Sequence, residues 1–186
     1  MFDNTNFIGD LSSWNTGNVI NMEYMFWGAG NFNSNLNLWN VSKVTSMQSM
    51  FEKAFAFNGE ISAWNTSAVT NFSYMFSEAT VFNQNLSSWD VSHATTIERM
   101  FRLASAFNQD LSAWSPIAAT TMYEFMLNSP LTQANYSALL NSWAGKAVQN
   151  NVYFGVGTTK YLVVASAARA NLVSRGWVIV DGGLGP

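Results

Sequence analysis

Tryptophan recurs every 25 residues through the first two-thirds of the chain, and this repeat constrains the fold more than any other feature of the sequence. The repeated tryptophans are Trp14, Trp39, Trp64, Trp89 and Trp114. Two further columns keep the same step: Phe7, Phe32, Phe57, Phe82 and Phe107, and Leu11, Leu36, Ile61, Leu86 and Leu111. Because a rare residue keeps this step, we expect residues 1–126 to consist of about five copies of one structural unit.

Apolar residues within one unit recur at spacings of three and four, the period of a helical turn with one buried face. In one unit these residues are Val44, Met47, Met50, Phe51 and Ala54. The Leu-x-x-Trp-x-Val/Thr stretch of each unit alternates inward and outward positions, which predicts a short strand. A unit of 25 residues cannot bury its own apolar face, so neighbouring units must stack. The sequence therefore predicts an α/β solenoid of 25-residue coils, each a short strand plus a helical turn.

The last third of the chain loses the repeat pattern and has signals of a C-terminal cap. Thr132 can cap a helix that continues to Ala144. Beyond it the sequence predicts a strand, a helix and a strand at residues 152–154, 165–174 and 177–180. We therefore divide the chain into a repeat solenoid at residues 1–126 and a capping region at residues 127–186 that is continuous with it.

The composition excludes several classes of partner. Charged residues make up only 10% of the chain, and the formal net charge is −3. No basic cluster is present to neutralise phosphates, so we expect no nucleic-acid partner. The absence of cysteine excludes disulfides, thiolate metal sites and cysteine nucleophiles. No apolar run approaches the ~20 residues that span a bilayer, so we expect no membrane insertion.

One column of the repeat alternates acidic and amide side chains: Asp10, Asn35, Glu60, Asn85 and Asp110. Such a row could supply the several oxygen ligands that calcium requires. The chain has no glycine-rich aspartate loop, however, and solvated turn residues explain the same pattern. We therefore predict no metal site and no cofactor.

The only histidine, His93, follows Ser92 and lies three residues after Asp90. Its column in the other units holds a variable set that is typical of a solvated position: Asn18, Lys43, Ala68 and Ala118. No serine lies in a Gly-x-Ser-x-Gly elbow. We therefore predict no catalytic residue in this chain.

The outward positions of the predicted strand form a candidate binding face. If the tryptophan and the residue two positions later point inward, the residues between and beside them point outward. This polar row consists of Asn15, Asn40, Asn65, Asp90, Ser42, Ser67 and Ser92. A flat, amide-rich surface suits a shallow contact with a protein or a glycan. A second strip, with Tyr24, Trp27 and Tyr74, either stacks on sugars or packs between neighbouring coils.

The stretch FNQNLSSWDVSHATTIERMFRLASAFNQDLSAW resembles the repeat of BspA-type leucine-rich-repeat surface proteins of bacteria. The shared skeleton, Phe-Asn-x-x-Leu-Ser-x-Trp-Asn/Asp-x-Ser-x-Val-x-x-Met-x-x-Met-Phe-x-x-Ala, runs with small departures from Phe7 to Met126. The chain departs from the wider leucine-rich-repeat class at the position that usually holds a buried asparagine. That position holds Val19, Val44, Val69, Ala94 and Ala119.

The resemblance implies an LRR-like solenoid in a bacterial protein that is extracellular or attached to the cell surface. It implies a non-enzymatic module for adhesion or for protein or glycan binding. A structural spacer or stalk segment of a larger surface protein is the first alternative, and a hydrolytic enzyme is the second.

Overall fold

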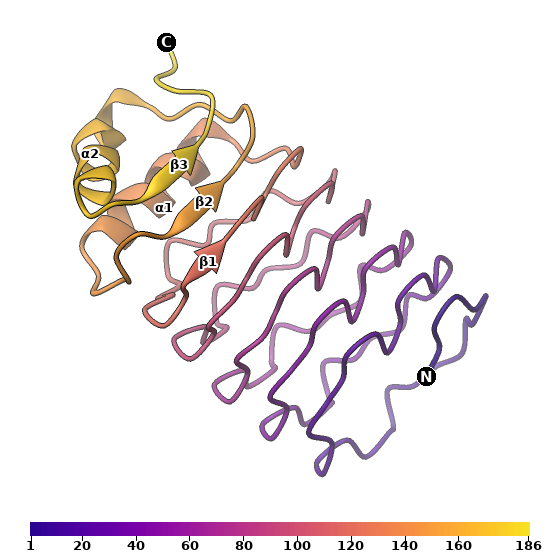
Figure 1. The fold of residues 1–186 in the computed structure, drawn as a ribbon. Helices are drawn as coiled ribbons and strands as arrows, with labels where there is room; N and C mark the ends of the chain where they lie inside the picture. Colours follow the sequence, from indigo (N-terminus) through magenta and orange to yellow (C-terminus); the bar gives the residue numbers. More distant parts are fainter.

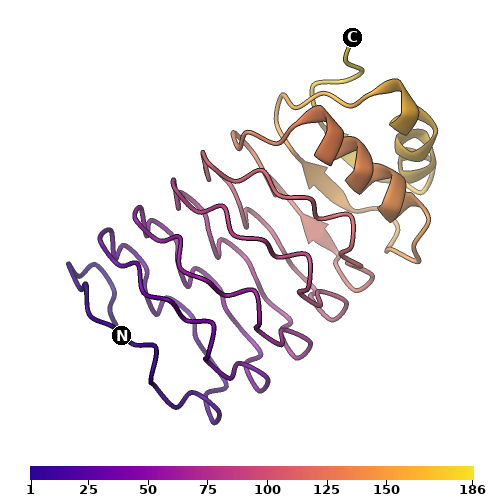
Figure 2. The ribbon, with the colours of Figure 1, turned by 180° about the vertical axis from the view of Figure 1, so that it is seen from behind.

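Regular secondary structure in the computed structural model, which describes residues 1–186, is confined to the C-terminal third (Figure 1). The elements are β1 (Thr121–Met122), α1 (Gln133–Ala144), β2 (Tyr153–Gly155), the 3-10 turn η1 (Val163–Ala165), α2 (Ser166–Ser174) and β3 (Val178–Val180). The strands form an open parallel sheet in the order β1-β2-β3. Figure 2 shows the opposite side, where α1 lies against the sheet and α2 lies beside α1.

The predicted α/β solenoid, with a strand and a helical turn in every LRR-like coil, is wrong. The structure has two short α-helices and three short strands, and none of them begins before Thr121. Residues 1–120 form successive turns, with only isolated single-residue bridges between them. The strands that do exist form one open sheet near the C-terminus rather than one strand in each repeat.

Backbone conformation explains why the apolar spacing of three and four does not produce a helix. Ser49 and Lys53 both have left-handed backbones, with φ of 53° and 60°. An α-helix requires φ near −63° at every residue, so each left-handed residue ends the right-handed turn before it. The N–H groups of Met50, Glu52 and Ala54 instead donate to the carbonyls three residues earlier. Consecutive β-turns therefore place apolar residues at the same spacing as a helix would.

The same two left-handed positions recur through the repeats. One set is Tyr24, Ser49, Tyr74, Arg99 and Glu124, and the other is Gly28, Lys53, Glu78, Leu103 and Asn128. Around these positions, every second N–H group donates to a carbonyl 24 residues later, in the next segment. The pairs are Met47 with Asn71, Ser49 with Ser73, Phe51 with Met75 and Lys53 with Ser77. Single parallel bridges continue the line from Asn21 through Ser46, Asn71 and Thr96 to Thr121 in β1. The 25-residue segments therefore lie side by side, as Figure 1 shows.

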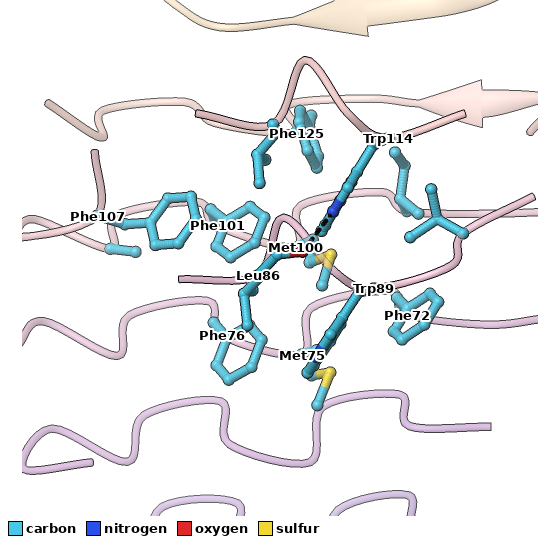
Figure 3. Close-up of a cluster of buried hydrophobic side chains, with 14 of the residues drawn as sticks. Phe72, Met75, Phe76, Leu86, Trp89, Met100, Phe101, Phe107, Trp114 and Phe125 are labelled. Atoms are coloured by element: carbon cyan, nitrogen blue, oxygen red, sulfur yellow. Dashed lines mark hydrogen bonds between the residues drawn. The ribbon is translucent and has the colours of Figure 1, made fainter. Parts of the chain in front are cut away.

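The core between the two sides of these segments is a continuous cluster of 49 buried hydrophobic residues. Aromatic rings from successive segments lie parallel in it: the centroids of Phe51 and Phe76 are 5.6 Å apart, as are those of Phe76 and Phe101. Figure 3 shows part of this cluster, with Trp89 and Trp114 in equivalent positions. Burial of these columns provides the main stabilising free energy of the fold.

From the second repeat onward, the tryptophan of each repeat also forms a hydrogen bond to the preceding segment. The indole Nε1–H of Trp114 donates to the carbonyl of Leu86 at 2.8 Å, the dashed line in Figure 3. The equivalent pairs are Trp39 with Leu11, Trp64 with Leu36 and Trp89 with Ile61. Each bond pairs a buried indole N–H, and the accepting carbonyl also accepts from the backbone N–H three residues later.

The C-terminal elements follow the sequence-based expectations closely. The predicted cap of α1 is confirmed, because Thr132 Oγ1 accepts from the N–H of Asn135 at 3.3 Å. The predicted strands at residues 152–154 and 177–180 shift by one residue to become β2 and β3. Tyr153 in β2 pairs with Val178 in β3, which retains the 25-residue offset of the repeat. Neither helix has the length and hydrophobicity needed to cross a membrane.

Side chains of the C-terminal region join it to the last repeat and hold it together. Ser142 Oγ and Lys146 Nζ donate to the carbonyl of Ser112 at 2.6 and 3.0 Å. At the far end, the carboxylate of Asp181 is 2% exposed and accepts from Tyr136 Oη at 2.7 Å and from Arg169 Nε at 2.8 Å. The chain after β3 is therefore anchored to both helices.

Candidate ligand-binding surface

The predicted polar row is exposed, but most of its hydrogen-bond acceptors are used within the row. The side-chain oxygens of Asn15, Asn40, Asn65 and Asp90 each accept from the N–H two residues later, at 2.8 to 3.2 Å. Ser42 Oγ and Ser67 Oγ donate to the same asparagine oxygens at 2.7 Å. These are Asx turns, which order the backbone. The row therefore has a structural role that reduces what it can offer to a partner.

Ser92 lies in this row, and it does not form a catalytic relay with its neighbour His93. Ser92 Oγ is 3.2 Å from His93 Nδ1, and both side chains are at the surface. Hydrogen bonds from the Ser92 hydroxyl, and to a lesser extent from the Ser92 backbone N–H, lower the pKa of Asp90. No third group orients the imidazole, as a nucleophilic site requires.

The acidic-to-amide column also uses its oxygens locally. Asp10 accepts from the N–H of Ser12 at 2.8 Å and from Ser34 Oγ at 3.1 Å. Asn35 donates to the carboxylate of Glu60 at 3.4 Å. No three acidic or histidine side chains in the chain converge as ligands for one ion.

A different surface gathers charged and aromatic side chains. On the turns that begin at the first left-handed position of each repeat, a hollow of about 320 Å³ is lined by six residues from four successive segments: Glu52, Tyr74, Ser77, Arg99, Arg102 and Glu124. Tyr74, Arg99 and Glu124 share one left-handed column, so the backbone places them next to one another. Glu52, Ser77 and Arg102 occupy the column three residues later. We call this set the turn-face hollow.

Arg99 is the centre of the turn-face hollow. Its Nε donates to Glu124 Oε2 at 2.7 Å, and its Nη1 donates to the hydroxyl of Tyr74. The guanidinium carbon lies 5.3 Å from the ring centroid of Tyr74 and 4.8 Å from that of Tyr123, which is within cation–π range. The hydrogen bond with Glu124 raises the pKa of Arg99, and the Arg99 guanidinium lowers the pKa of the Glu124 carboxyl. Both side chains are therefore charged at neutral pH.

Arg102 is held less tightly than Arg99. Its closest approaches to the carboxylates of Glu78 and Glu124 are both 3.5 Å. The Nη2 atoms of both arginines have no hydrogen-bond partner in the protein, and neither has the carboxylate of Glu52. The hollow therefore presents free donors and free acceptors side by side.

Sequence reasoning found only part of this surface. Of the predicted aromatic strip, Tyr74 lines the hollow, while the hydroxyl of Tyr24 accepts from Gln48 Nε2 at 2.8 Å, and Trp27 lies 5.4 Å from the ammonium of Lys53. The arginines and Glu124 were missed because their columns differ in residue type from one repeat to the next. That variation was the available signal, since constant columns form the core.

Comparison with known families gives one match. The sequence model of the family described as "Mycoplasma protein of unknown function, DUF285" matches residues 1–63 and 35–143. The two matches together span more than half of the chain, so the chain belongs to this family. No curated protein and no solved structure matches the chain.

Proposed function

We propose that this chain is a non-enzymatic binding module that contacts a protein or glycan partner through the turn-face hollow. The observation that supports it is the set of unpaired Arg and Glu atoms beside Tyr74 in a concave surface. A few convergent polar groups next to an aromatic ring are typical of a recognition site. The polar row is a weaker candidate because its acceptors are committed to Asx turns.

The charge state of the hollow favours binding over catalysis. A general base works best when its pKa lies near the operating pH. The pKa of Glu124 is lowered instead, because Arg99 stabilises its charged form. Such a carboxylate accepts a proton poorly at neutral pH and is better suited to hydrogen bonding a ligand.

We further propose that the module acts in adhesion, outside the cell or at the bacterial cell surface. The resemblance of the repeat to BspA-type surface proteins supports this location. The low content of charged residues, 10%, leaves a surface rich in amides and hydroxyls, which suits contacts that depend little on salt. A structural spacer within a larger surface protein is the alternative.

An array of matrix proteins and glycans, probed with the purified chain at low and high salt, tests the proposal. We expect binding that changes little with salt. A double variant of the hollow, Glu52→Gln with Arg102→Gln, should weaken it. The matched control on the polar row, Asn40→Ser with Asn65→Ser, keeps a side chain that can form the turn and should bind like the parent.

Two results would contradict the proposal. Absence of binding across the array would favour the spacer. Binding that is lost only in the polar-row variant would move the interface to the face that contains Asn40 and Asn65.

A further inference from the structure

We propose that the turn-face hollow recognises a neutral glycan, through vicinal hydroxyl groups that bridge its arginine and glutamate side chains. This inference rests on the proposed binding function and names the ligand class for that surface. It commits to an uncharged carbohydrate rather than an acidic glycan or a peptide.

The hollow has unused hydrogen-bonding capacity of both kinds. The Nη2 groups of Arg99 and Arg102 can donate, and the carboxylate of Glu52 and the second oxygen of Glu124 can accept. A sugar hydroxyl both donates and accepts, so two neighbouring hydroxyls satisfy a guanidinium and a carboxylate together. Arg102 and Glu124, 3.5 Å apart, are spaced for such a pair of hydroxyls to bind across them.

The charges of the hollow favour a neutral ligand. The hollow and its edge contain two arginines, Arg99 and Arg102, and four carboxylates, Glu52, Glu78, Glu98 and Glu124. An incoming anion therefore meets a net negative site and has to compete with Glu124 for Arg99 at 2.7 Å. An incoming cation is attracted by the net negative charge but has to compete with Arg99 and Arg102 for the carboxylates that they already pair with. A neutral ligand uses the remaining hydrogen-bonding positions without breaking an ion pair or desolvating a further charge.

The shape of the surface also suits a sugar ring. Tyr74 and Tyr123 come from the segments before and after that of Arg99, both rings lie near its guanidinium, and both are partly exposed. A half-exposed tyrosine offers an apolar ring surface beside a polar hydroxyl, which matches the mixed faces of a sugar ring. The hollow, about 320 Å³, lies at the small end of the range for ligand sites and would hold about one or two rings.

The experiment measures the affinity of the full chain for three sets of immobilised probes: neutral oligosaccharides, acidic oligosaccharides with carboxylate or sulfate groups, and basic peptides. Single variants Glu52→Gln and Arg102→Gln remove one charged hydrogen-bonding group each. Glu60→Gln is the matched control, because Glu60 lies in the same repeat and outside the hollow. Thermal melting of each variant confirms that it is folded.

We expect a neutral oligosaccharide to bind, and each hollow variant to weaken its binding about tenfold, as loss of a hydrogen bond to a charged group predicts. Glu60→Gln should leave affinity unchanged. Binding of acidic probes or basic peptides only, or neutral-glycan binding that ignores both hollow variants, overturns the inference. If a matrix protein binds through the hollow and no glycan does, the inference fails while the proposed binding function stands. Silence of every probe, proteins included, refutes both.

Discussion

Replacing Trp64 with alanine tests whether the indole column holds the repeats together. Trp64 is 3% exposed, lies between Trp39 and Trp89 at centroid distances of 6.4 and 5.9 Å, and donates to the carbonyl of Leu36 at 2.8 Å. A tryptophan buries roughly 150–250 Å², worth about 4–6 kcal/mol of transfer free energy. Trp→Ala changes in cores cost about 3–5 kcal/mol. The carbonyl of Leu36 keeps its hydrogen bond from the backbone N–H of Trp39, so no unpaired acceptor adds to this cost. We expect Trp64→Ala to lower the free energy of unfolding by about 5 kcal/mol.

Differential scanning calorimetry checks this value, since about 5 kcal/mol corresponds to a fall in Tm of about 10–20 °C for a chain of this size. Trp64→Phe keeps one aromatic ring but removes the Nε1–H donor and part of the buried indole, so it should lose about 1–3 kcal/mol. Trp14→Ala is the matched control, because Trp14 is 39% exposed and donates no equivalent hydrogen bond. Its loss should be less than half that of Trp64→Ala. Equal losses at the two positions would refute the reasoning.

Three further predictions concern the turns, the C-terminal anchor and pH. Asn65→Ala should cost about 1 kcal/mol in urea unfolding, because it removes the acceptor for Ser67 N–H and Oγ, whereas an effect of zero would mean that this turn forms without it. Asp181→Ala leaves the donors of Tyr136 and Arg169 unpaired, so it should cost about 3 kcal/mol or more. It should also speed amide exchange in both helices, and unchanged exchange would contradict the anchor. Glu124 has a pKa lowered from its ordinary value of 4.5 by Arg99, so its contribution to stability is present above that value and is lost as pH falls through the lower folded pKa. When the pH falls below 4.5, Glu124→Gln should therefore lose less free energy of unfolding than the parent loses. Identical curves of unfolding free energy against pH would argue against the ion pair.

The sequence predicts which residues are buried better than it predicts the backbone that buries them. The Trp, Phe and Leu columns identify the core because a repeated apolar side chain needs the same environment in every repeat. Spacing of three and four does not separate a helix from consecutive β-turns, because both bring these residues to one side. The deciding feature is the left-handed backbone at residues such as Ser49 and Arg99. A glycine, as at Gly28, indicates such a conformation in a sequence, but serine and arginine do not.

The candidate surface was harder to predict for a related reason. Outward position alone selected Asn40 and Asn65, but a side chain that points outward can still be committed to its own turn. Contacts in the turn-face hollow join residues 25 positions apart in the sequence, such as Arg99 and Glu124. They follow from the backbone pairing between segments, and neither residue alone carries a local sequence signature.

The most direct test of the turn-face hollow as the binding surface is hydrogen–deuterium exchange of the chain with and without a saturating ligand from the array. Bound ligand should slow exchange in the turns at residues 74–78 and 99–103 and leave exchange at residues 40–42 and 65–67 unchanged. Protection confined to residues 40–42 and 65–67 would show instead that the polar row, and not the turn-face hollow, binds the ligand.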